Sequence, residues 1–319
     1  MTYPNFKVHV LLSGSRRKSL ELLTESFPSF DAIDTGDEIS YTRSENLGLK
    51  KCRSDLVCFL DNDTEVTPGW LDELIKEFRD PQVAAAVPKM YDFQGRLSSA
   101  GGICDYFGFA YNRGIGEEDH GQYDVPCYIP YACTAAAVMR RSVVAEVGYW
   151  DEECIAYYGD VDLSLRLLLR GYKIRYNPKS VVYHEHGGTR KWMRRSAIIG
   201  LWERDRVRTL LRIYENKTLM TVLPTLCVLK SLHFIYAVVT IRDPSEVRSV
   251  LAAYIWNLVH LKDTLRLRRR IKLIRLTSDA EFAHLLFPKS LELSVGLGKT
   301  FHPIARRGKG GSDYMSSAK

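Results

Sequence analysis

The sequence predicts an α/β fold, in which a mostly parallel sheet is sandwiched by helices, with a basic C-terminal helical extension. Two observations predict the sheet. Short apolar runs of strand length alternate with amphipathic segments from residue 7 to about residue 186. One run, 'DLVCFL' at 55–60, is apolar throughout, as expected of a strand that is buried on both faces. The extension is predicted by a change after about residue 190, where the sequence becomes basic and aromatic with helical patterning.

The bulk composition is that of a globular protein. The 319 residues are 45% hydrophobic and 26% charged, which suits one large domain or a domain with an appendage. The formal net charge of +7 suits phosphate-bearing or anionic-membrane partners, and much of the excess falls in 190–212 and 262–275. The seven cysteines are odd in number and form no Cys-x-x-Cys pair, which argues against a disulfide framework or a zinc site. The first residues do not form a signal peptide.

Strand and helix patterns alternate in the first ninety residues. The predicted elements are strands at 7–12, 55–60 and 83–91 and helices at 19–27 and 67–78. The last of these helices is expected to begin with Thr67 as its N-cap and Pro68 at its first helical position. Its apolar residues recur at spacings of three and four, which indicates that one face packs inward.

The next hundred residues continue the pattern after an irregular part. Residues 92–130 are rich in glycine, tyrosine and turns, and form either a loop-rich insert or a short antiparallel region. Residues 133–152 predict a strand followed by a helix. Residues 160–173 predict a helix that Gly171 closes as a C-cap, and 174–186 a final pair of strands.

Two carboxylates stand directly after the strand predicted at 55–60. Asp61, Asn62 and Asp63 follow its last residue. Ligands of parallel α/β sheets bind beyond the carboxyl ends of the strands. Paired carboxylates offer hard oxygen ligands for Mg²⁺ or Mn²⁺, which also bind substrate phosphates. Because Asp and Asn are also favoured in turns, the pair is either a metal site or a turn.

Two further groups of polar residues lie later in the chain. Asp160 and Asp162 occupy the first turn of a predicted helix, where the helix dipole favours acids. That explanation suffices for Asp162, but it does not account for the preceding Tyr157-Tyr158-Gly159, which could shape a pocket. His184 ends a β-branched run, and a single histidine in such a place is more often structural than a ligand.

Seven sequence motifs, taken together in their order and spacing, resemble those of a known family. They are 'ENLGL' (45–49), 'DLVCFLDNDTEVTPGWLDEL' (55–74), 'AGGICDYFG' (100–108), 'RGIGEEDHGQYD' (113–124), 'AAAVMRRSVVAEVGYWDE' (135–152), 'YYGDVDLSLRLLLRGYKIRYNP' (157–178) and 'VVYHEHGG' (181–188). With them the chain resembles the inverting nucleotide-sugar glycosyltransferases of family two, over about residues 45–215. The resemblance implies the A-type, Rossmann-like glycosyltransferase fold.

The resemblance also implies roles for the matching residues. Asp61 and Asp63, with Asn62 between them, match the Asp-x-Asp that binds the metal and the donor. His184 matches a histidine that completes the metal or diphosphate site. Asp160 matches the aspartate that acts as general base on the acceptor hydroxyl. The implied cofactor is Mg²⁺ or Mn²⁺, and the implied partners are a nucleotide-sugar donor and a glycan or lipid-linked acceptor of the cell envelope.

The N-terminal part departs from the family pattern. Gly159 stands where members usually have an acid, and the nucleotide-binding part is shortened. Either the first family strand is absent, or 30–38 is a shortened second strand that places Asp34 or Asp37 near the nucleotide base. A helix that normally carries Ala-Arg-Asn is expected to be missing before residue 55. A divergent donor site, a misplaced start and an inactive product all fit these departures.

We therefore expect a catalytic domain at 1–215, a helical, membrane-associating extension at 216–304 and a disordered tail at 305–319. Basic segments with Trp, Leu and Ile at 189–214 and 252–275 suit an anionic lipid surface, at the cytoplasmic face of the cell membrane. The alternatives are a helical appendage with solvated charges and a membrane span at 218–241. Nucleic acid is not an expected partner, because no base-stacking platform accompanies the basic run.

Two functions compete with the transferase. An inactive relative could serve as a scaffold or binding subunit, which the shortened N-terminal part favours and the retained acids disfavour. A nucleotidyltransferase would need a glycine-rich phosphate loop, of which 'SGSRRKS' at 13–19 is a faint version.

Overall fold

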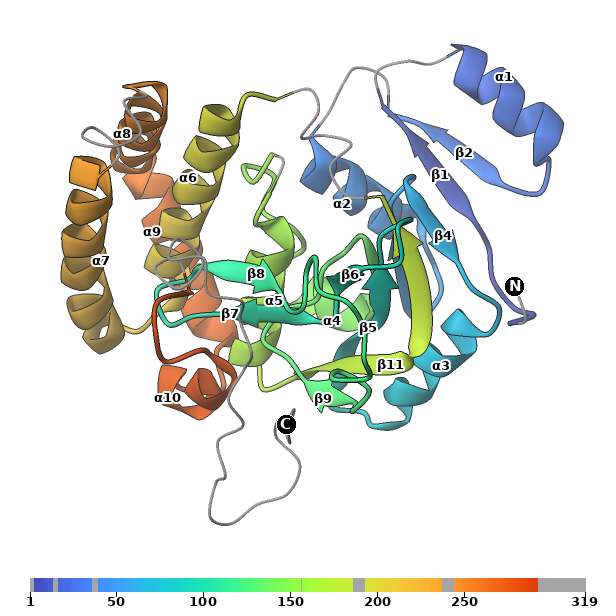
Figure 1. Cartoon of the computed structure of the whole chain (residues 1–319). Coiled ribbons are helices and arrows are strands. Elements are labelled where there is room, and N and C mark those ends of the chain that lie inside the picture. The colour runs from blue at the N-terminus through green and yellow to red at the C-terminus, as the bar shows by residue number, and fades with distance from the viewer. Residues whose placement is uncertain are drawn as a thin grey trace.

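The computed structural model describes residues 3–13, 17–35, 40–155, 157–185, 193–236 and 244–291. A seven-stranded sheet forms the centre of the molecule (Figure 1). Five strands follow the order β3-β10-β5-β11-β4, while β6 pairs with β5 and β9 with β11. Their bounds are β3 Leu56–Leu60, β4 Thr64–Val66, β5 Val83–Tyr91, β6 Leu97–Ser99, β9 Cys127–Tyr128, β10 Ala136–Arg140 and β11 Lys173–His184.

Strands β3, β5 and β11 of this sheet share one direction, and β10 runs opposite to them. Strands β3 and β5 both pair antiparallel with β10, which lies between them, and β5 pairs parallel with β11. The carboxyl ends of β3, β5 and β11 therefore meet at one edge of the sheet. The predicted α/β fold is confirmed. The expectation that 55–60 is buried on both faces is wrong, because β3 ends the strand order and exposes Cys58 and Leu60.

Helices cover both faces of the sheet. Helix α3 (Trp70–Lys76) buries Trp70, Leu71 and Leu74 against side chains of β5, β10 and β11. Helices α4 (Arg141–Glu146) and α5 (Gly159–Leu169) contribute to a second, larger apolar core with the other sides of these strands. The sandwich of helices about the sheet thus follows from apolar residues at alternating strand positions and on one side of each helix.

Two local predictions about these elements are wrong. Helix α3 begins at Trp70 with Gly69 as its N-cap, because Gly69 has a positive φ of 79° that interrupts the helical path. The Thr67 hydroxyl instead donates a hydrogen bond to the carbonyl of Val181 (2.8 Å) and fastens the turn to β11. The two strands expected at 174–186 are one long strand, β11, whose pairing with β5 shifts between Asn177 and Val181.

The glycine-rich residues 92–130 form a short antiparallel region, which was one of the two predicted alternatives. Strands β6 and β9 extend the central sheet from this region. Strands β7 (Gly102–Cys104) and β8 (Ala110–Asn112) pair as a separate hairpin. Tyr158, just before α5, donates a hydrogen bond to the Gly108 carbonyl and so ties this hairpin to the start of the helix.

The N-terminal part contains two parallel strands. Strands β1 (His9–Leu12) and β2 (Asp31–Asp34) pair with each other, and α1 (Arg17–Ser26) connects them. This arrangement favours the predicted alternative in which a shortened second strand is present. Helix α2 (Tyr41–Lys51) directly precedes β3, so the expectation that no helix lies there is wrong. Residues 14–16 of the faint phosphate loop, and Asp37, lie outside the described residues.

The C-terminal helices pack together beside the sheet, on the left of Figure 1. They are α6 (Arg195–Ile213), α7 (Asn216–Tyr236), α8 (Pro244–Val259), α9 (Leu261–Ile274) and α10 (Asp279–Phe282). The segment after α9 returns to α5, where the Leu276 and Thr277 amides donate to the Leu169 carbonyl. Residues on both sides of the expected boundary at 215 thus contact each other, while the predicted tail at 305–319 lies outside the described residues.

Part of the basic character predicted for residues 189–214 is internal. Arg206, Arg208 and Arg212 of α6 are buried, with at most 4% of each exposed, and they pair with acids inside the molecule. Arg194 and Arg195 are exposed, so the described part of the segment carries both buried and solvent-facing charges. Within the described ranges, no helix has both the length and the apolar character that crossing a bilayer requires.

Candidate metal and catalytic site

Two loops at the carboxyl edge of the sheet bring three predicted residues together. Asp61 leaves β3 with its amide donating to the Ala135 carbonyl (2.9 Å), and Thr64 closes the turn onto the Asp61 carbonyl. Strand β4 then pairs antiparallel with the end of β11, which places Thr64 opposite His184. The amide of Glu185 donates to the Asp63 carbonyl (3.0 Å). The backbone therefore fixes the two aspartates beside the histidine.

The side chains of these residues form a candidate cation site. His184 Nε2 lies 3.2 Å from Asp63 Oδ1 and 4.0 Å from Asp61 Oδ2. One ligand atom from each residue lies within 4.8 Å of the other two. His184 is buried, whereas Asp61 and Asp63 are partly exposed, so the group is accessible from one side. The side chain of Asn62 is exposed, and Asn62 is not a member of the group.

The electrostatics of the group favour a bound cation. Burial, followed by the charges of Asp63 and Asp160, raises the pKa of Asp61 to about 7. A divalent cation would offset this repulsion between carboxylates. Two carboxylates and an imidazole suit Mn²⁺, and carboxylates with substrate phosphates suit Mg²⁺. The residues present thus fit the predicted metal.

Asp160 lies in the first turn of α5, next to this group. Its Oδ1 accepts a hydrogen bond from the Val161 amide (2.8 Å), and its carboxylate also accepts one from the Thr134 amide. Burial nevertheless raises the pKa of Asp160 to about 6. Thr134, whose amide donates to Asp160, is followed by Ala135, whose carbonyl accepts from the Asp61 amide, so adjacent residues of one segment contact both aspartates. A carboxylate held in this way can accept a proton close to neutral pH.

Asp162, two residues further along α5, lies in the first turn of the helix, as predicted. It is also fully buried. Its Oδ2 accepts hydrogen bonds from Nε and Nη2 of Arg166 (3.0 and 2.8 Å), and its Oδ1 accepts one from the Thr209 hydroxyl (3.1 Å). Asp162 is therefore part of an interior ion-pair network between α5 and α6.

The structure does not bring Asp34 into the metal group. Asp34 is the exposed last residue of β2, in the two-stranded sheet rather than the central one. Its predicted contact with the nucleotide base remains a prediction. Of the predicted site residues, Asp61, Asp63, His184 and Asp160 come together, while Asn62 and Asp34 stand apart.

Two residues of α2 belong to the site but were not predicted. The Tyr41 hydroxyl lies 2.9 Å from the hydroxyl of Thr134, and the amide of Thr134 is the group that donates to Asp160. Burial, followed by the charge of Asp61, raises the pKa of Glu45 to about 8. Tyr41 and Glu45 are one helical turn apart, so they share a face of α2. The word 'ENLGL' begins with Glu45, but it gave no indication that its first residue faces the carboxylates.

Comparison with known proteins gives a family match. The family model described as glycosyl transferase family group 2 matches residues 56–265. The pre-mycofactocin glycosyltransferase of Mycobacterium tuberculosis is 34% identical over 163 residues, which are 49% of this chain and 33% of that protein. The O-antigen biosynthesis protein RfbC of Myxococcus xanthus is 27% identical over 203 residues, or 59% of this chain and 16% of RfbC. The chain thus matches only a third or less of these relatives.

Solved structures support the fold. The structure of residues 1–349 of TarS from S. aureus superposes with a TM-score of 0.52 at 13% identity, covering 93% of this chain and 85% of that one. GalNAc-T7, solved with UDP, GalNAc and Mn²⁺, gives a TM-score of 0.50 at 14% identity, covering 66% and 42%. At such low identity, these similarities bear on the fold alone.

Proposed function

The chain belongs to glycosyl transferase family group 2, and from this premise we propose that it transfers a sugar, with inversion, from a nucleotide-diphosphate-sugar to a hydroxyl of a glycan or lipid-linked acceptor. The observation that carries the proposal is the meeting of Asp61, Asp63 and His184 with Asp160 at the carboxyl edge of the sheet. The names of the relatives, which include an O-antigen biosynthesis protein, make a cell-envelope glycan the favoured acceptor.

Each residue has a chemical task in this proposal. Asp61, Asp63 and His184 would hold Mg²⁺ or Mn²⁺, which when bound neutralises charge on the leaving diphosphate. Asp160 accepts the proton of the acceptor hydroxyl as that oxygen attacks the anomeric carbon from the opposite face. The attack needs no covalent enzyme intermediate. Burial, followed by the charge of Asp160, raises the pKa of Cys133, so this nearby thiol stays protonated and is a poor nucleophile.

Calorimetric titration of the wild-type protein with UDP-, GDP- and dTDP-sugars, with and without Mn²⁺, tests the donor half of the proposal. We expect one nucleotide class to bind, and its affinity to depend on Mn²⁺. The matched control is the corresponding nucleoside monophosphate, which lacks the diphosphate. If a folded sample binds none of these donors, the transferase proposal fails.

That failure would favour the second candidate, a scaffold or binding subunit without catalytic activity. The observation in its favour is the shortened N-terminal part, in which the described residues 3–13 and 17–35 form two short strands, β1 and β2, in a sheet separate from the central one. An inactive relative would also tolerate Gly159 in place of an acid. The two candidates differ in one measurable property, which is metal-dependent donor binding.

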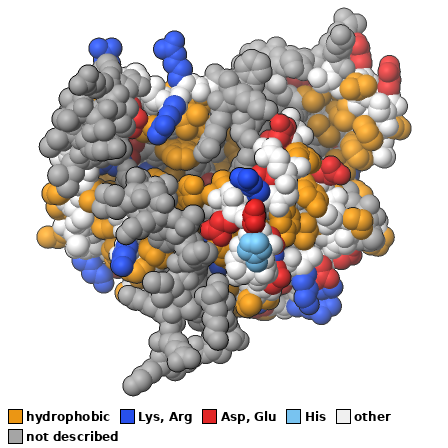
Figure 2. Space-filling view, viewed as in Figure 1, with side chains coloured by type: hydrophobic (Ala, Val, Ile, Leu, Met, Phe, Trp, Pro, Cys, Tyr) orange, Lys and Arg blue, Asp and Glu red, His pale blue; other side chains and the backbone are white. Residues whose placement is uncertain are grey.

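We also propose that the protein attaches through α8 and α9 to the cytoplasmic face of the membrane and meets its acceptor there. Leu251, Ile255, Leu258 and Val259 recur at helical spacing on one face of α8, and their exposed fractions rise from 48% to 72% along the helix. Exposed basic side chains follow on α9, namely Lys262, Arg266, Arg269, Arg270 and Lys272. In Figure 2, Lys and Arg side chains project at the upper left of the molecule, the side on which the C-terminal helices lie in Figure 1. An apolar stripe beside cations complements an anionic lipid surface.

Co-sedimentation with phosphatidylglycerol vesicles tests this surface. We expect the double variant Leu258→Glu, Val259→Glu to bind at least about tenfold more weakly, because two buried apolar contacts become two repelled charges. The control Leu22→Glu changes an equally exposed leucine on α1 and should bind as the wild type does. Equal binding by the double variant and the wild type would refute the proposed surface.

A further inference from the structure

The loop between α4 and α5, which leads directly to Asp160, is held from two sides. On one side lies Asn46 of α2. Its Nδ2 donates to the Trp150 carbonyl (3.0 Å) and to Glu152 Oε1 (3.1 Å), and its Oδ1 accepts from the Trp150 amide (2.9 Å). Helix α2 also carries Tyr41 and Glu45 of the candidate site. This side of the loop is therefore tied to the elements around the metal group.

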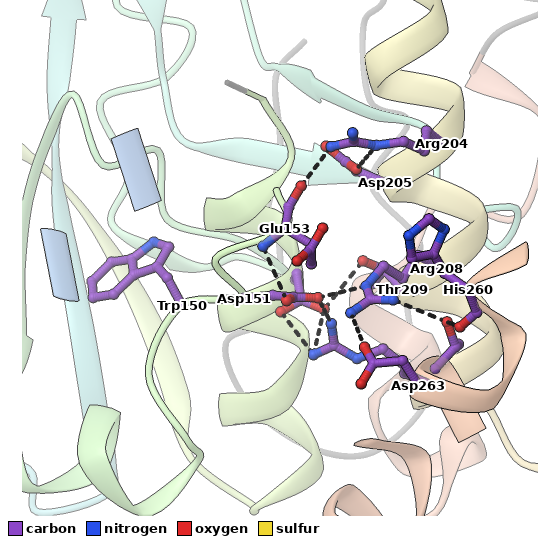
Figure 3. Close-up of polar contacts among 12 residues, drawn as sticks. Trp150, Asp151, Glu153, Arg204, Asp205, Arg208, Thr209, His260 and Asp263 are labelled. Carbon is purple, nitrogen blue, oxygen red and sulfur yellow. Dashed lines mark hydrogen bonds and ion pairs between the residues drawn. The ribbon is translucent and has the colours of Figure 1, made fainter. Parts of the chain in front are cut away.

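The other side of the loop is held by arginines of α6, as Figure 3 shows. Asp151 Oδ2 accepts hydrogen bonds from Arg208 Nε (2.8 Å) and from Arg212 Nη1. Arg208 reaches further to α9, where it donates to Asp263 Oδ2 (2.8 Å) and the Thr264 hydroxyl (3.0 Å). The C-terminal helices thus fix the loop through a charged side chain, not merely by apolar packing.

Arg212 connects this loop to the catalytic helix itself. Its Nη2 lies 3.3 Å from Oδ1 of Asp162, which is two residues beyond Asp160 in the same first turn of α5. The guanidinium of Arg212 thus pairs with Asp151, which precedes Asp160 in the sequence, and with Asp162, which follows it. The side chains of Arg208, Arg212, Asp151 and Asp162 are between 0% and 8% exposed. So deeply buried, these pairs are weakly screened and have little freedom to rearrange.

Each charged group of this network has an oppositely charged partner. Arg166, Arg208 and Arg212 face Asp151, Asp162 and Asp263, and Arg266 also pairs with Asp263. Although burial alone would raise it, the guanidinium groups of Arg212 and Arg208 lower the pKa of Asp151 to about 2. Asp151 therefore stays ionised near neutral pH. Loss of one member leaves a buried charge without its partner.

We propose that Asp151, Arg208 and Arg212, here called the ionic clasp, are positioning residues that set the direction of the Asp160 carboxylate for sugar transfer. The inference rests on the proposed function. Arginine suits this task because its planar guanidinium can hydrogen-bond to two carboxylates in a fixed geometry, which a lysine ammonium cannot do. It also gives the C-terminal helices a role in the reaction, since α6 and α9 supply the groups that hold the loop.

Conservative substitutions test the clasp against a merely stabilising role. Arg212→Lys keeps the positive charge but loses the planar guanidinium. Asp151→Asn keeps the shape of the side chain but loses its negative charge. The matched control is Arg96→Lys, an exposed arginine just before β6. The readouts are the affinity for the UDP-, GDP- or dTDP-sugar that binds the wild type, the rate at which water releases the nucleoside diphosphate from it, and amide hydrogen exchange over residues 147–165.

We expect both variants to release the nucleoside diphosphate at least about tenfold more slowly, because a misplacement of about 1 Å can cost 100-fold in rate. Donor affinity should stay within about twofold, since the clasp does not touch the metal group. Exchange should quicken in the first turn of α5 but not in α3. A folded variant with wild-type release and exchange would overturn the proposal, as would loss of donor affinity in parallel with rate.

The three measurements distinguish a failure of this inference from a failure of the proposed function. If the wild type neither binds nor hydrolyses a donor, the proposed function fails, and the exchange arm alone decides whether the clasp orders the first turn of α5. If Arg212→Lys does not fold, Asp151→Asn carries the test, because it keeps the volume of the side chain and its hydrogen-bonding oxygen. Unchanged exchange in folded Asp151→Asn overturns the clasp in either case.

Discussion

Replacing Asp160 by asparagine is expected to slow sugar transfer by about 10²- to 10⁴-fold, with donor affinity unchanged. The amide keeps the shape of the side chain, and the Val161 amide can still donate to its oxygen. It cannot accept the proton of the attacking hydroxyl. Because Asp160 is not one of the three candidate ligands, its loss should leave the metal and the diphosphate in place.

Release of the nucleoside diphosphate, with either water or a glycan acceptor, measures this effect. The control is Glu153→Gln, which removes an exposed acid from the preceding loop and should retain wild-type activity. A pH profile adds a second check. Since the base must be ionised and the pKa of Asp160 is raised to about 6, the wild-type rate should fall as the pH drops below 6. Wild-type turnover by Asp160→Asn would remove Asp160 from the mechanism.

Elements of the fold whose residues are all buried could be predicted from the sequence. The strand expected at 83–91 coincides with β5, because every residue before Tyr91 is buried and no solvent-facing residue interrupts the run. From the residues alone, Asp61 and Asp63 are either a metal site or a turn, and it is the resemblance to the family that joins His184 to them. In the structure all three lie at or just after the ends of β3 and β11, which share an edge. The position of a residue relative to a strand end is a local property, so the sequence carries it.

The partners of buried charges could not be predicted. Asp162 has a sufficient local explanation at the start of a helix, yet its partner Arg212 lies fifty residues later. Composition likewise makes Arg208 and Arg212 of α6 look like part of a basic surface, although their counter-ions come from the loop at 151 and, for Arg208, from α9 as well. Periodicity shows which residues share a face of a helix, but it does not show which distant acid that face will meet.

Replacing Asp63 by alanine is expected to lower the affinity for Mn²⁺ by at least about 100-fold. Changes in groups that only orient a metal ligand already cost 10- to 100-fold, and Asp63 would be a ligand itself. The fold should survive, since the bond from the Glu185 amide goes to the Asp63 main chain and not to its side chain. Calorimetric titration with Mn²⁺ alone measures the effect, and Glu65→Ala, an exposed acid on β4, is the control.

The pH dependence of the same titration links the loss to this site. A proton on Asp61, whose pKa is raised to about 7, competes with the cation, so wild-type Mn²⁺ affinity should rise by up to tenfold per pH unit below 7 and level off above it. The charge of Asp63 is one cause of that raised pKa, so in Asp63→Ala the remaining dependence should move to lower pH. Wild-type Mn²⁺ affinity in the variant would place the cation elsewhere. Lost affinity with an unshifted profile would leave Asp63 as a ligand but assign the titration to a group other than Asp61.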